Sequence, residues 1–369
     1  MTNNLGDWNT FEKLYKNSKG NYDSILAYVN GIKYLKLRTI SKGIRIKAFA
    51  KEKHIVNSSS LSIKKLLPLC FEQSTEKEIE DFINKIYTKE RKDQKTLDEK
   101  LYSELTKVKN VDWGGVRQNN LETSIVNIVK ATPNYDDMME KIKNSIILST
   151  EGWAISNWYS FWSNDVIENL IKDHKKILPG IGDIKHIDFF WDNVPMDLKS
   201  SKFAAGFIQE KRRKNKLKTE FSVIKKYANE QKINFDRTKT DTIIEKEIME
   251  TIKISNNQSW NNFIQKNIYD IRKKILCEAI DDPTEYAIWN YTNQGEARFG
   301  DENRFFLILI DKETTDTSWK LKREIKFMRE KINQFLDRGL NDQLLRNIHF
   351  SFGGKNYVGH CCILFIIEE

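Results

Sequence analysis

The chain has 369 residues, and its 61 lysines and arginines outnumber its 52 aspartates and glutamates, which gives a formal net charge of +9. This length suits one large domain or two ordinary ones, and the positive balance suits a polyanionic partner. No run of about 18 apolar residues occurs, so the sequence predicts no transmembrane helix. The first residues lack the basic and then apolar pattern of a secretory signal, and we expect a cytoplasmic protein without a membrane partner.

The four cysteines do not indicate a disulfide framework, because such frameworks belong mainly to short secreted chains. Cys361 and Cys362 follow His360, a combination of residue types that can bind zinc. Their spacing does not match that of a two-cysteine zinc knuckle, and residues 358–367 have the apolar character of a buried strand. We therefore expect reduced thiols and no zinc site.

Residues 1–110 are predicted to be mainly helical. Thr75 with Glu78 three residues later is the pattern of a capping box, and apolar residues at helical spacing follow it. Residues 88–100 are almost wholly polar, which indicates a solvated helix or a mobile connection. Residues 31–49 are basic and amphipathic and could contact a DNA backbone. An ordinary helical or strand surface with extended lysine side chains is the favoured interpretation of that segment.

Two further helices are predicted at residues 119–131 and 134–147, because Pro133 separates two helical patterns. A third helix is predicted to begin at Ser163, whose hydroxyl can cap it, and to run to about Lys176. The Pro-Gly pair that follows ends this helix and leads into the most informative segment of the chain.

Residues 184–200 have the pattern of a β-hairpin around the turn dipeptide Asp192-Asn193. Strand side chains alternate between the two faces of a sheet. Six apolar residues therefore share one face of this hairpin, namely Ile187, Phe189, Trp191, Val194, Met196 and Leu198.

The opposite face of the hairpin carries Asp188, Asp197 and Lys199. A two-residue turn pairs Trp191 with Val194 and places Asp188 opposite Asp197, where Cβ atoms are roughly 4.5–5.5 Å apart. Two carboxylates this close need a neutralising partner, and a hard divalent cation is the natural one. Lys199 can then hold an anion or a water near that cation. A hairpin with a solvated polar face is the alternative interpretation.

This arrangement resembles the active-site motif of the PD-(D/E)xK nuclease superfamily, which includes most type II restriction endonucleases. The motif has an acid on one strand and acid–x–Lys on the next, here Asp188 and Asp197-Leu198-Lys199. The chain departs from the pattern because its proline, Pro195, lies on the second strand and because its second acid is Asp instead of the commoner Glu.

The resemblance implies an α/β fold of the restriction-endonuclease-like kind, with a mixed central sheet flanked by helices. It also implies that Asp188 and Asp197 bind Mg²⁺, and that Lys199 positions or helps to deprotonate the attacking water. In many members of the superfamily, a glutamate on the helix before the hairpin supplies another ligand or orients one. The resemblance therefore implies a catalytic role for Glu168. Asp165 is the competing residue, and an ordinary exposed helix carboxylate is the alternative.

Basic residues after the hairpin are candidates for phosphate contacts. They are Lys211, Arg212, Arg213 and Lys214, which lie in a charged helical insertion at about residues 205–285. Arg298 and Arg304 belong to a polar, glycine-containing segment that could approach nucleic acid. A solvated helix face and an ordinary connecting loop are the alternatives.

Three further strands are predicted to complete the sheet. Residues 305–310 form an apolar run, predicted to be a buried strand beside the hairpin. Residues 347–353 and 356–367 are predicted to be closing strands around two glycines. We therefore divide the chain into residues 1–110, a mainly helical region and possible DNA-contacting subdomain, and residues 111–369, the nuclease domain.

The function that the resemblance implies is that of a type II site-specific deoxyribonuclease, which hydrolyses phosphodiester bonds of double-stranded DNA with Mg²⁺. It further implies a homodimer and a cognate DNA methyltransferase in the same restriction system. Two alternatives stay open. One is a defence nuclease, repair nuclease or RNase of the same fold, and the other is a non-catalytic nucleic-acid-binding protein that uses only its basic surface.

Overall fold

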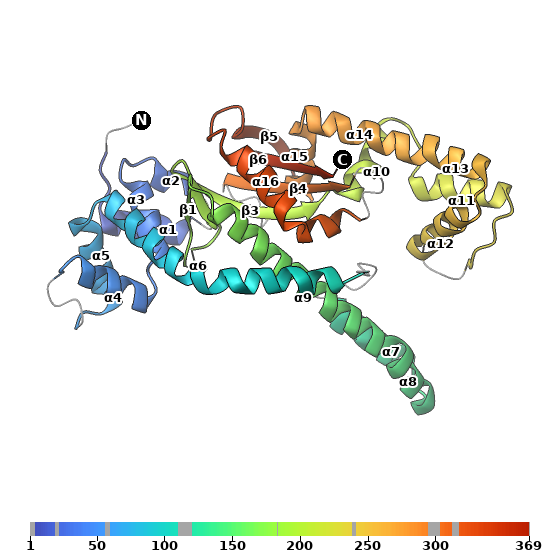
Figure 1. The fold of residues 1–369 in the computed structure, drawn as a ribbon, viewed down its shortest axis with the longest axis horizontal. Helices are drawn as coiled ribbons and strands as arrows, with labels where there is room; N and C mark the ends of the chain where they lie inside the picture. Colours follow the sequence, from blue (N-terminus) through green and yellow to red (C-terminus); the bar gives the residue numbers. More distant parts are fainter. Residues whose placement is uncertain are drawn as a thin grey trace. The chain divides into compact units, whose positions relative to one another are not determined.

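The computed structural model describes residues 4–18, 22–55, 60–109, 120–182, 184–237, 241–293, 303–311 and 317–368. The protein combines many helices with a six-stranded sheet of strand order β1-β2-β3-β4-β6-β5 (Figure 1). The strands are β1 (Ile177–Pro179), β2 (Phe189–Trp191), β3 (Val194–Lys202), β4 (Asn303–Asp311), β5 (Arg346–Phe352) and β6 (Lys355–Glu368).

The sheet is mixed, as predicted for an α/β protein. β3 pairs with β4 and β4 with β6 in parallel, whereas β1–β2, β2–β3 and β5–β6 are antiparallel pairs. The apolar run that forms β4 is buried and lies beside β3, which confirms its predicted place next to the hairpin. Gly353 and Gly354 turn the chain between β5 and β6 with φ angles of 57° and 77°, values that glycine adopts without strain.

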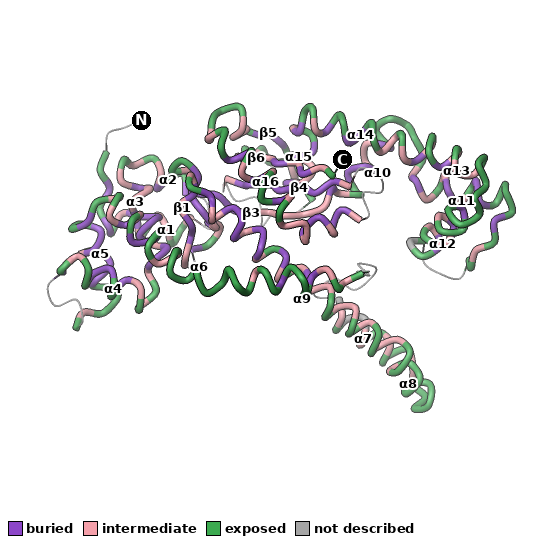
Figure 2. The backbone as a smooth tube through the Cα atoms, in the orientation of Figure 1, coloured by how far each residue is buried: buried purple, intermediate pink, exposed green. Residues whose placement is uncertain are grey.

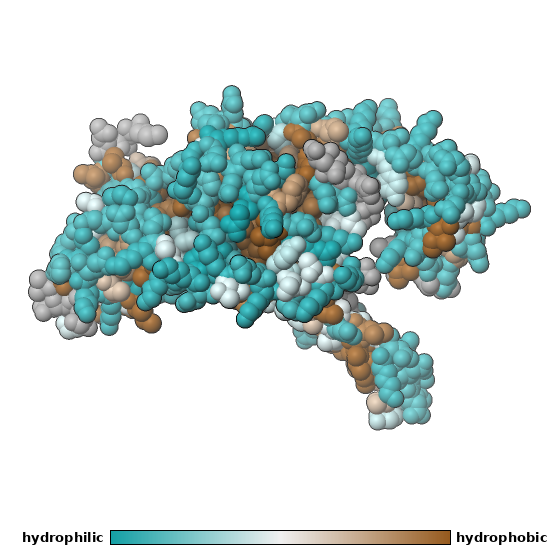
Figure 3. All heavy atoms as spheres, in the orientation of Figure 1, coloured by the Kyte–Doolittle hydropathy of each residue, from teal (hydrophilic) through white to brown (hydrophobic). Residues whose placement is uncertain are grey.

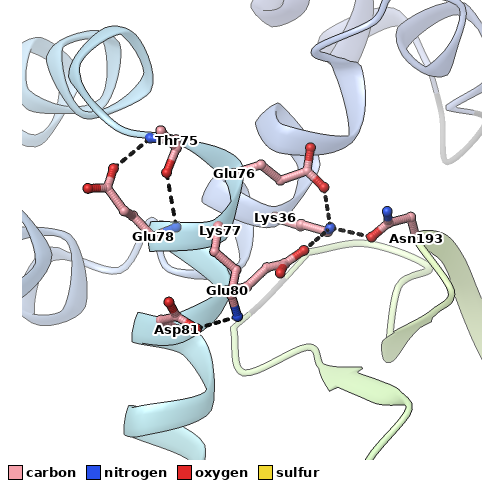
Figure 4. A network of polar contacts seen from close by, with 8 residues as sticks. All are labelled: Lys36, Thr75, Glu76, Lys77, Glu78, Glu80, Asp81 and Asn193. Atoms are coloured by element: carbon pink, nitrogen blue, oxygen red, sulfur yellow. Dashed lines mark hydrogen bonds and ion pairs between the residues drawn. The ribbon is translucent and has the colours of Figure 1, made fainter.

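The N-terminal region is helical, as predicted. Its helices are α1 (Trp8–Asn17), α2 (Asp23–Leu26), α3 (Gly31–Thr39), α4 (Gly43–Glu52), α5 (Ile63–Gln73) and α6 (Glu76–Lys107). The capping box at the start of α6 is confirmed, because the Thr75 N–H donates to Glu78 Oε2 at 2.7 Å and the Glu78 N–H donates to Thr75 Oγ1 at 3.3 Å (Figure 4). The polar residues 88–100 belong to the same continuous helix.

The later helical segments come in three groups, before β1, between β3 and β4, and between β4 and β5. They are α7 (Asn120–Ala131), α8 (Tyr135–Lys141), η1 (Ile142–Ile146), α9 (Ile147–Lys172), α10 (Ala205–Lys214), α11 (Glu220–Glu230), α12 (Asp241–Ile254), α13 (Gln258–Ile264), η2 (Gln265–Tyr269), α14 (Asp270–Asp281), α15 (Thr284–Thr292), η4 (Ser318–Arg323) and α16 (Ile325–Leu336).

The prediction that a helix begins at Ser163 is wrong. α9 runs through this position without interruption, and Ser163 is fully buried within it. The Ser163 hydroxyl donates to the Ser160 carbonyl at 3.3 Å, a bond that a serine inside a helix can make to its own preceding turn. The Ser163 hydroxyl, which the sequence predicts to cap a helix start, therefore makes its hydrogen bond within α9.

The chain divides into two compact units. The first comprises Met1–Leu97, Ile167–Phe207 and Leu276–Glu369, and the second comprises Asp98–Val166 and Ile208–Ile275. The six strands and the helices α1–α5 all belong to the first unit. The second part of the second unit lies within the predicted helical insertion at about residues 205–285.

Helices cover both faces of the sheet in the first unit, and β2 and β4 are the most completely buried strands, whereas β5 and the start of β6 are partly exposed (Figure 2). On one face, α9 and α16 pack against apolar residues of β2, β3, β4 and β6. On the other face, α15 supplies Tyr286 and Tyr291. The Tyr291 ring lies 5.7 Å from the ring of Phe306 on β4 and 5.3 Å from that of Phe350 on β5, measured between centroids.

A separate apolar cluster joins the N-terminal helices to the hairpin. It contains residues of α1–α6 together with Ile184, Ile187 and Phe190. The sequence pattern predicts Ile187 on the same face as Phe189 and Trp191, and this prediction is wrong. β2 begins only at Phe189, so the alternation does not extend to Ile187, which packs beneath the N-terminal helices instead.

The second unit has a core of its own, formed by α11, α12, α13 and η2. Other apolar side chains of this unit stay exposed, among them Val126 and Val129 on α7, where Figure 3 shows a hydrophobic patch. Among the described residues, no helix is long and apolar enough to cross a membrane.

Candidate functional site

The predicted hairpin is present with the predicted register. Trp191 pairs with Val194 and Phe189 with Met196. Asp192 and Asn193 form the turn with φ angles of 47° and 67°, the left-handed values that a tight two-residue hairpin turn requires. Asp and Asn tolerate this conformation better than most residues, which is why the dipeptide predicted the turn correctly.

Asp188 lies one residue beyond the paired part of β2, and three hydrogen bonds hold it against its neighbours. Its N–H donates to the Met196 carbonyl at 2.8 Å, and its carbonyl accepts the Gly180 N–H at 2.9 Å. Its carboxylate Oδ2 accepts the Leu198 N–H at 2.7 Å. The two partners Met196 and Leu198 flank Asp197 in β3. Asp188 is therefore bonded to the chain on both sides of Asp197, which brings the two aspartates next to each other.

Gly180 makes this close approach possible. A Cβ atom at this position would lie 2.6 Å from the Asp188 carbonyl oxygen, closer than real Cβ atoms come to a neighbour. Any side chain at this position would therefore push Asp188 away from the turn after β1. The sequence pattern indicates Gly180 only as a helix terminator, and nothing close to it in the chain predicts its contact with Asp188.

Asp197 and Lys199 lie on β3 and contact each other. The Lys199 Nζ donates to Asp197 Oδ1 at 2.7 Å and also lies 2.7 Å from Oδ2. The Asp197 side chain is 6 % exposed and that of Lys199 is 44 % exposed. Asp197 is therefore fixed in the protein, whereas the lysine ammonium reaches solvent and a ligand arriving from solvent.

Glu168 lies on α9, near enough to Asp188 for its negative charge to act on that carboxyl. Its carboxylate forms an ion pair of 2.5 Å with Lys172, one helical turn later. The Lys172 ammonium also donates to the Gly180 carbonyl at 2.8 Å. Lys172 was not predicted as a site residue, although its spacing of four residues from Glu168 is the spacing at which helix side chains meet.

These groups change the acidity of Asp188. Burial raises the pKa of this carboxyl, and the negative charges of Glu168 and Asp197 add to the effect, so that the pKa reaches about 6. The Leu198 N–H and the charge of Lys172 act in the opposite direction and are too weak to cancel it. Asp188 is therefore a carboxylate short of positive charge, a condition that a bound cation relieves.

The N-terminal helices hold the hairpin from outside the sheet. Lys36 is fully buried, and its ammonium donates to Glu76, Glu80 and the turn residue Asn193, each at 2.5 Å (Figure 4). The Tyr22 hydroxyl donates to the Lys185 carbonyl at 2.5 Å. Lys36 belongs to the basic segment at residues 31–49, but it is buried and therefore inaccessible to DNA. Its hydrogen bond to Asn193 supports the hairpin turn instead.

The residues at this site suit a hard cation. Asp188 and Asp197 present only oxygen donors, and Asp197 Oδ2 is buried with no hydrogen-bond partner among the described residues apart from its ion pair with Lys199. Among all the residues that the structure describes, no set of three or more His, Cys, Asp or Glu side chains could hold a metal ion by itself. This donor set fits Mg²⁺, which usually binds one or two carboxylates and keeps water or substrate oxygens as its other ligands.

The candidate phosphate contacts differ in accessibility. Arg213 and Lys214 are exposed at the end of α10, and Lys211 is partly exposed. Arg212 is buried, and its guanidinium donates to the carbonyls of Lys218 at 2.9 Å and Asn267 at 3.1 Å. These bonds join elements of the second unit, which argues for a structural role of Arg212 in place of a phosphate contact.

The two arginines near β4 also differ from a surface pair. Arg304 is 1 % exposed, with its guanidinium 5.1 Å from the centre of the Tyr291 ring, so it is not a surface contact in this structure. It is the register partner of Asp197 on the neighbouring strand. Arg298 lies outside the described residues.

Comparisons of the chain with known proteins found no relative. No protein-family model matches the chain, and neither the curated proteins nor the solved structures searched contain a match.

Proposed function

We propose that the protein is a Mg²⁺-dependent endonuclease that hydrolyses phosphodiester bonds of double-stranded DNA. The observation that carries the proposal is the placement of Asp188, one residue before β2, beside Asp197 on β3, with Lys199 in contact with the second carboxylate. A buried carboxylate, Asp197, and a partly buried one, Asp188, beside a solvent-accessible lysine are the chemistry that the PD-(D/E)xK resemblance requires. The proposal also includes a role for the ion pair between Glu168 and Lys172, which lies beside the two aspartates.

The chain's own residues have separate tasks in this proposal. Asp188 and Asp197 would hold the metal from two strands, and their main-chain bonds keep both carboxylates in place before substrate arrives. When bound, Mg²⁺ would lower the pKa of a water and stabilise charge on the phosphate oxygens. Lys199 would leave its contact with Asp197 to donate to the attacking water or to a phosphate oxygen, and it would offset negative charge in the transition state.

Glu168 and Lys172 would adjust the charge around this centre. The Glu168 carboxylate acts on Asp188 through space, and it helps to keep the pKa of Asp188 raised in the absence of a cation. Lys172 neutralises Glu168 and ties α9 to the turn at Gly180. We propose that this pair sets how strongly the two aspartates attract a cation.

The finer parts of the proposal concern the biological setting. A restriction enzyme of type II would act as a homodimer on a palindromic site, because the two-fold symmetry of the protein matches that of the site. A cognate DNA methyltransferase would protect the host DNA, and the cytoplasm would be the place of action. The basic residues Lys211, Arg213 and Lys214 would contact the backbone of the DNA.

Digestion of DNA tests the proposal. The purified protein is incubated with several diverse, unmethylated phage and plasmid DNAs, with Mg²⁺ and with a chelator. Discrete fragments that form only with Mg²⁺ support a site-specific endonuclease. Absence of cleavage on every DNA, together with ordinary DNA binding, would instead support the non-catalytic alternative.

A further inference from the structure

A cavity of about 440 Å³ lies in the first unit, between α6 and the segment that joins α9 to β1. Its lining includes five cationic side chains, namely Arg91, Lys92, Lys95, Lys172 and Lys175, against the single carboxylate of Asp173. The cavity therefore carries a clear excess of positive charge at neutral pH.

The one carboxylate in the lining is already neutralised. Arg91 donates from Nε to Asp173 Oδ1 at 2.8 Å and from Nη2 to Oδ2 at 3.0 Å, and the Tyr87 hydroxyl donates to Oδ1 at 2.9 Å. Burial alone would raise the pKa of Asp173, but the hydrogen bonds and charge of Arg91 keep it below its usual value. The Arg91–Asp173 pair thus forms a neutral wall, and it leaves no carboxylate of the lining to neutralise Lys92 and Lys95.

Other groups around the cavity cancel this charge only in part. Glu168 pairs with Lys172 at 2.5 Å. His174 is buried, and burial lowers its pKa against the effect of nearby Asp337. Asp337 lies 3.6 Å from Lys175 and offsets that lysine in part. Lys92 and Lys95 are exposed and make no ion pair among the described residues. Like charges at this helical spacing destabilise a helix, so an anion between them would stabilise it.

We propose that this cavity binds a backbone phosphate of the nucleic-acid strand, next to the candidate catalytic centre. The position of the cavity beside the carboxylate pair indicates that the phosphate belongs to the nucleic-acid strand. Lys172 lines the cavity and also contacts Glu168 and the Gly180 carbonyl, while the Gly180 N–H is bonded to Asp188. One side chain thus connects the cavity with the carboxylate pair. This inference rests on the proposed function, because a polynucleotide repeats its phosphates and can occupy both places together.

The test measures binding without chemistry. Affinity for a labelled DNA duplex of arbitrary sequence is measured by fluorescence anisotropy in a chelating buffer at several salt concentrations. The variant Lys92→Ala/Lys95→Ala is compared with Lys89→Ala/Lys100→Ala, which removes the same charge from exposed positions of α6 outside the cavity lining. Circular dichroism checks that both variants keep the native helix content.

We expect the cavity variant to bind the duplex at least several-fold more weakly, and the slope of its salt dependence to fall by roughly 0.9 for each phosphate that the protein no longer neutralises. The matched variant should keep the wild-type slope and affinity. Equal slopes for the two variants would overturn the proposal. A mononucleotide that binds the wild type in the cavity and displaces no duplex would overturn it too, because it would assign the cavity to a small ligand.

The two proposals can fail separately. If wild-type protein cleaves DNA and the cavity variant binds and cleaves as well as the matched variant, the cavity assignment is wrong and the nuclease stands. If wild-type protein cleaves no DNA but the cavity variant alone loses duplex affinity and salt dependence, the phosphate site stands and the nuclease is wrong.

Discussion

The main-chain N–H of Leu198 donates a hydrogen bond of 2.7 Å to the carboxylate of Asp188. Through this bond, the strand that carries Asp197 and Lys199 holds Asp188, the residue just before the neighbouring strand, in a fixed orientation. A carboxylate positioned by the backbone needs little rearrangement when a ligand binds, which is the property that a catalytic metal site requires. The separate parts of this arrangement can each be tested by substitution.

Lys199→Ala should reduce DNA cleavage by at least about a hundredfold, the scale seen when one electrostatic stabiliser is lost. Its side chain is 44 % exposed and packs in no apolar cluster, so the stability of the protein and its affinity for DNA should change little. Thermal unfolding and duplex binding serve as controls beside the cleavage rate. A variant with full cleavage activity would remove Lys199 from the mechanism.

Asp188→Asn should abolish cleavage and yet stabilise the protein at neutral pH. The folded state raises the pKa of Asp188 from 3.8 to about 6. Between these values the folded state retains a proton that the unfolded state releases, so this carboxyl destabilises the fold increasingly as the pH rises through about 4 to 6. The neutral amide of asparagine does not titrate, so it does not destabilise the fold as the pH rises. Its oxygen can still accept the hydrogen bond from the Leu198 N–H.

The expected gain is of the order of 1–3 kcal/mol above pH 6, and it should vanish near pH 4. Chemical unfolding of both proteins at several pH values measures it. Added Mg²⁺ should narrow the difference, because the cation stabilises only the wild-type carboxylate. A variant that is less stable than wild type at pH 7 would show that Asp188 is not short of positive charge.

Gly180→Ala should impair the site without removing any of its functional groups. The added Cβ would meet the Asp188 carbonyl oxygen at 2.6 Å, so Asp188 or the turn must shift. We expect a loss of at least tenfold in cleavage rate and a destabilisation of roughly 1–3 kcal/mol. Raised Mg²⁺ concentration should restore part of the rate if the shift weakens metal binding. Unchanged kinetics would mean that the contact with Asp188 carries no functional weight.

Met196→Ala and Leu198→Ala test which face of the hairpin is the core. Met196 is fully buried against α9 and α16, and its truncation should cost roughly 2–5 kcal/mol. Leu198 packs on the same cluster but is only partly buried, so its truncation should cost less, roughly 1–3 kcal/mol. Urea unfolding ranks the two. Loss of stability in Lys199→Ala with no loss in Met196→Ala would invert the face assignment.

The sequence was most informative where the local chemistry determines the structure. Asp192-Asn193 favours a left-handed turn whatever surrounds it, so the hairpin and its register could be predicted. The Thr75 and Glu78 capping box and the buried run of β4 were predictable for the same reason. These features depend on residues close together in the chain, and the fold preserves them.

The sequence was least informative where distant residues decide the structure. Ser163 has the residue type of a helix cap, but α9 already extends through it and the serine bonds to its own helix. Lys36 belongs to a basic segment, and only the fold shows that it supports the turn at Asn193. Arg212 and Arg304 likewise count as surface charges in a sequence, whereas packing buries both.

Cleavage of unmethylated phage DNA by three proteins purified in parallel tests the central claim most directly. They are the wild type, Asp197→Asn and Asp93→Asn, the last of which removes an exposed carboxylate of α6 outside the site. With Mg²⁺, we expect the wild type and Asp93→Asn to give the same discrete fragments at similar rates, and Asp197→Asn to give none. Equal cleavage by Asp197→Asn, or no cleavage by the wild type, would contradict the assignment of the carboxylate pair as a nuclease centre.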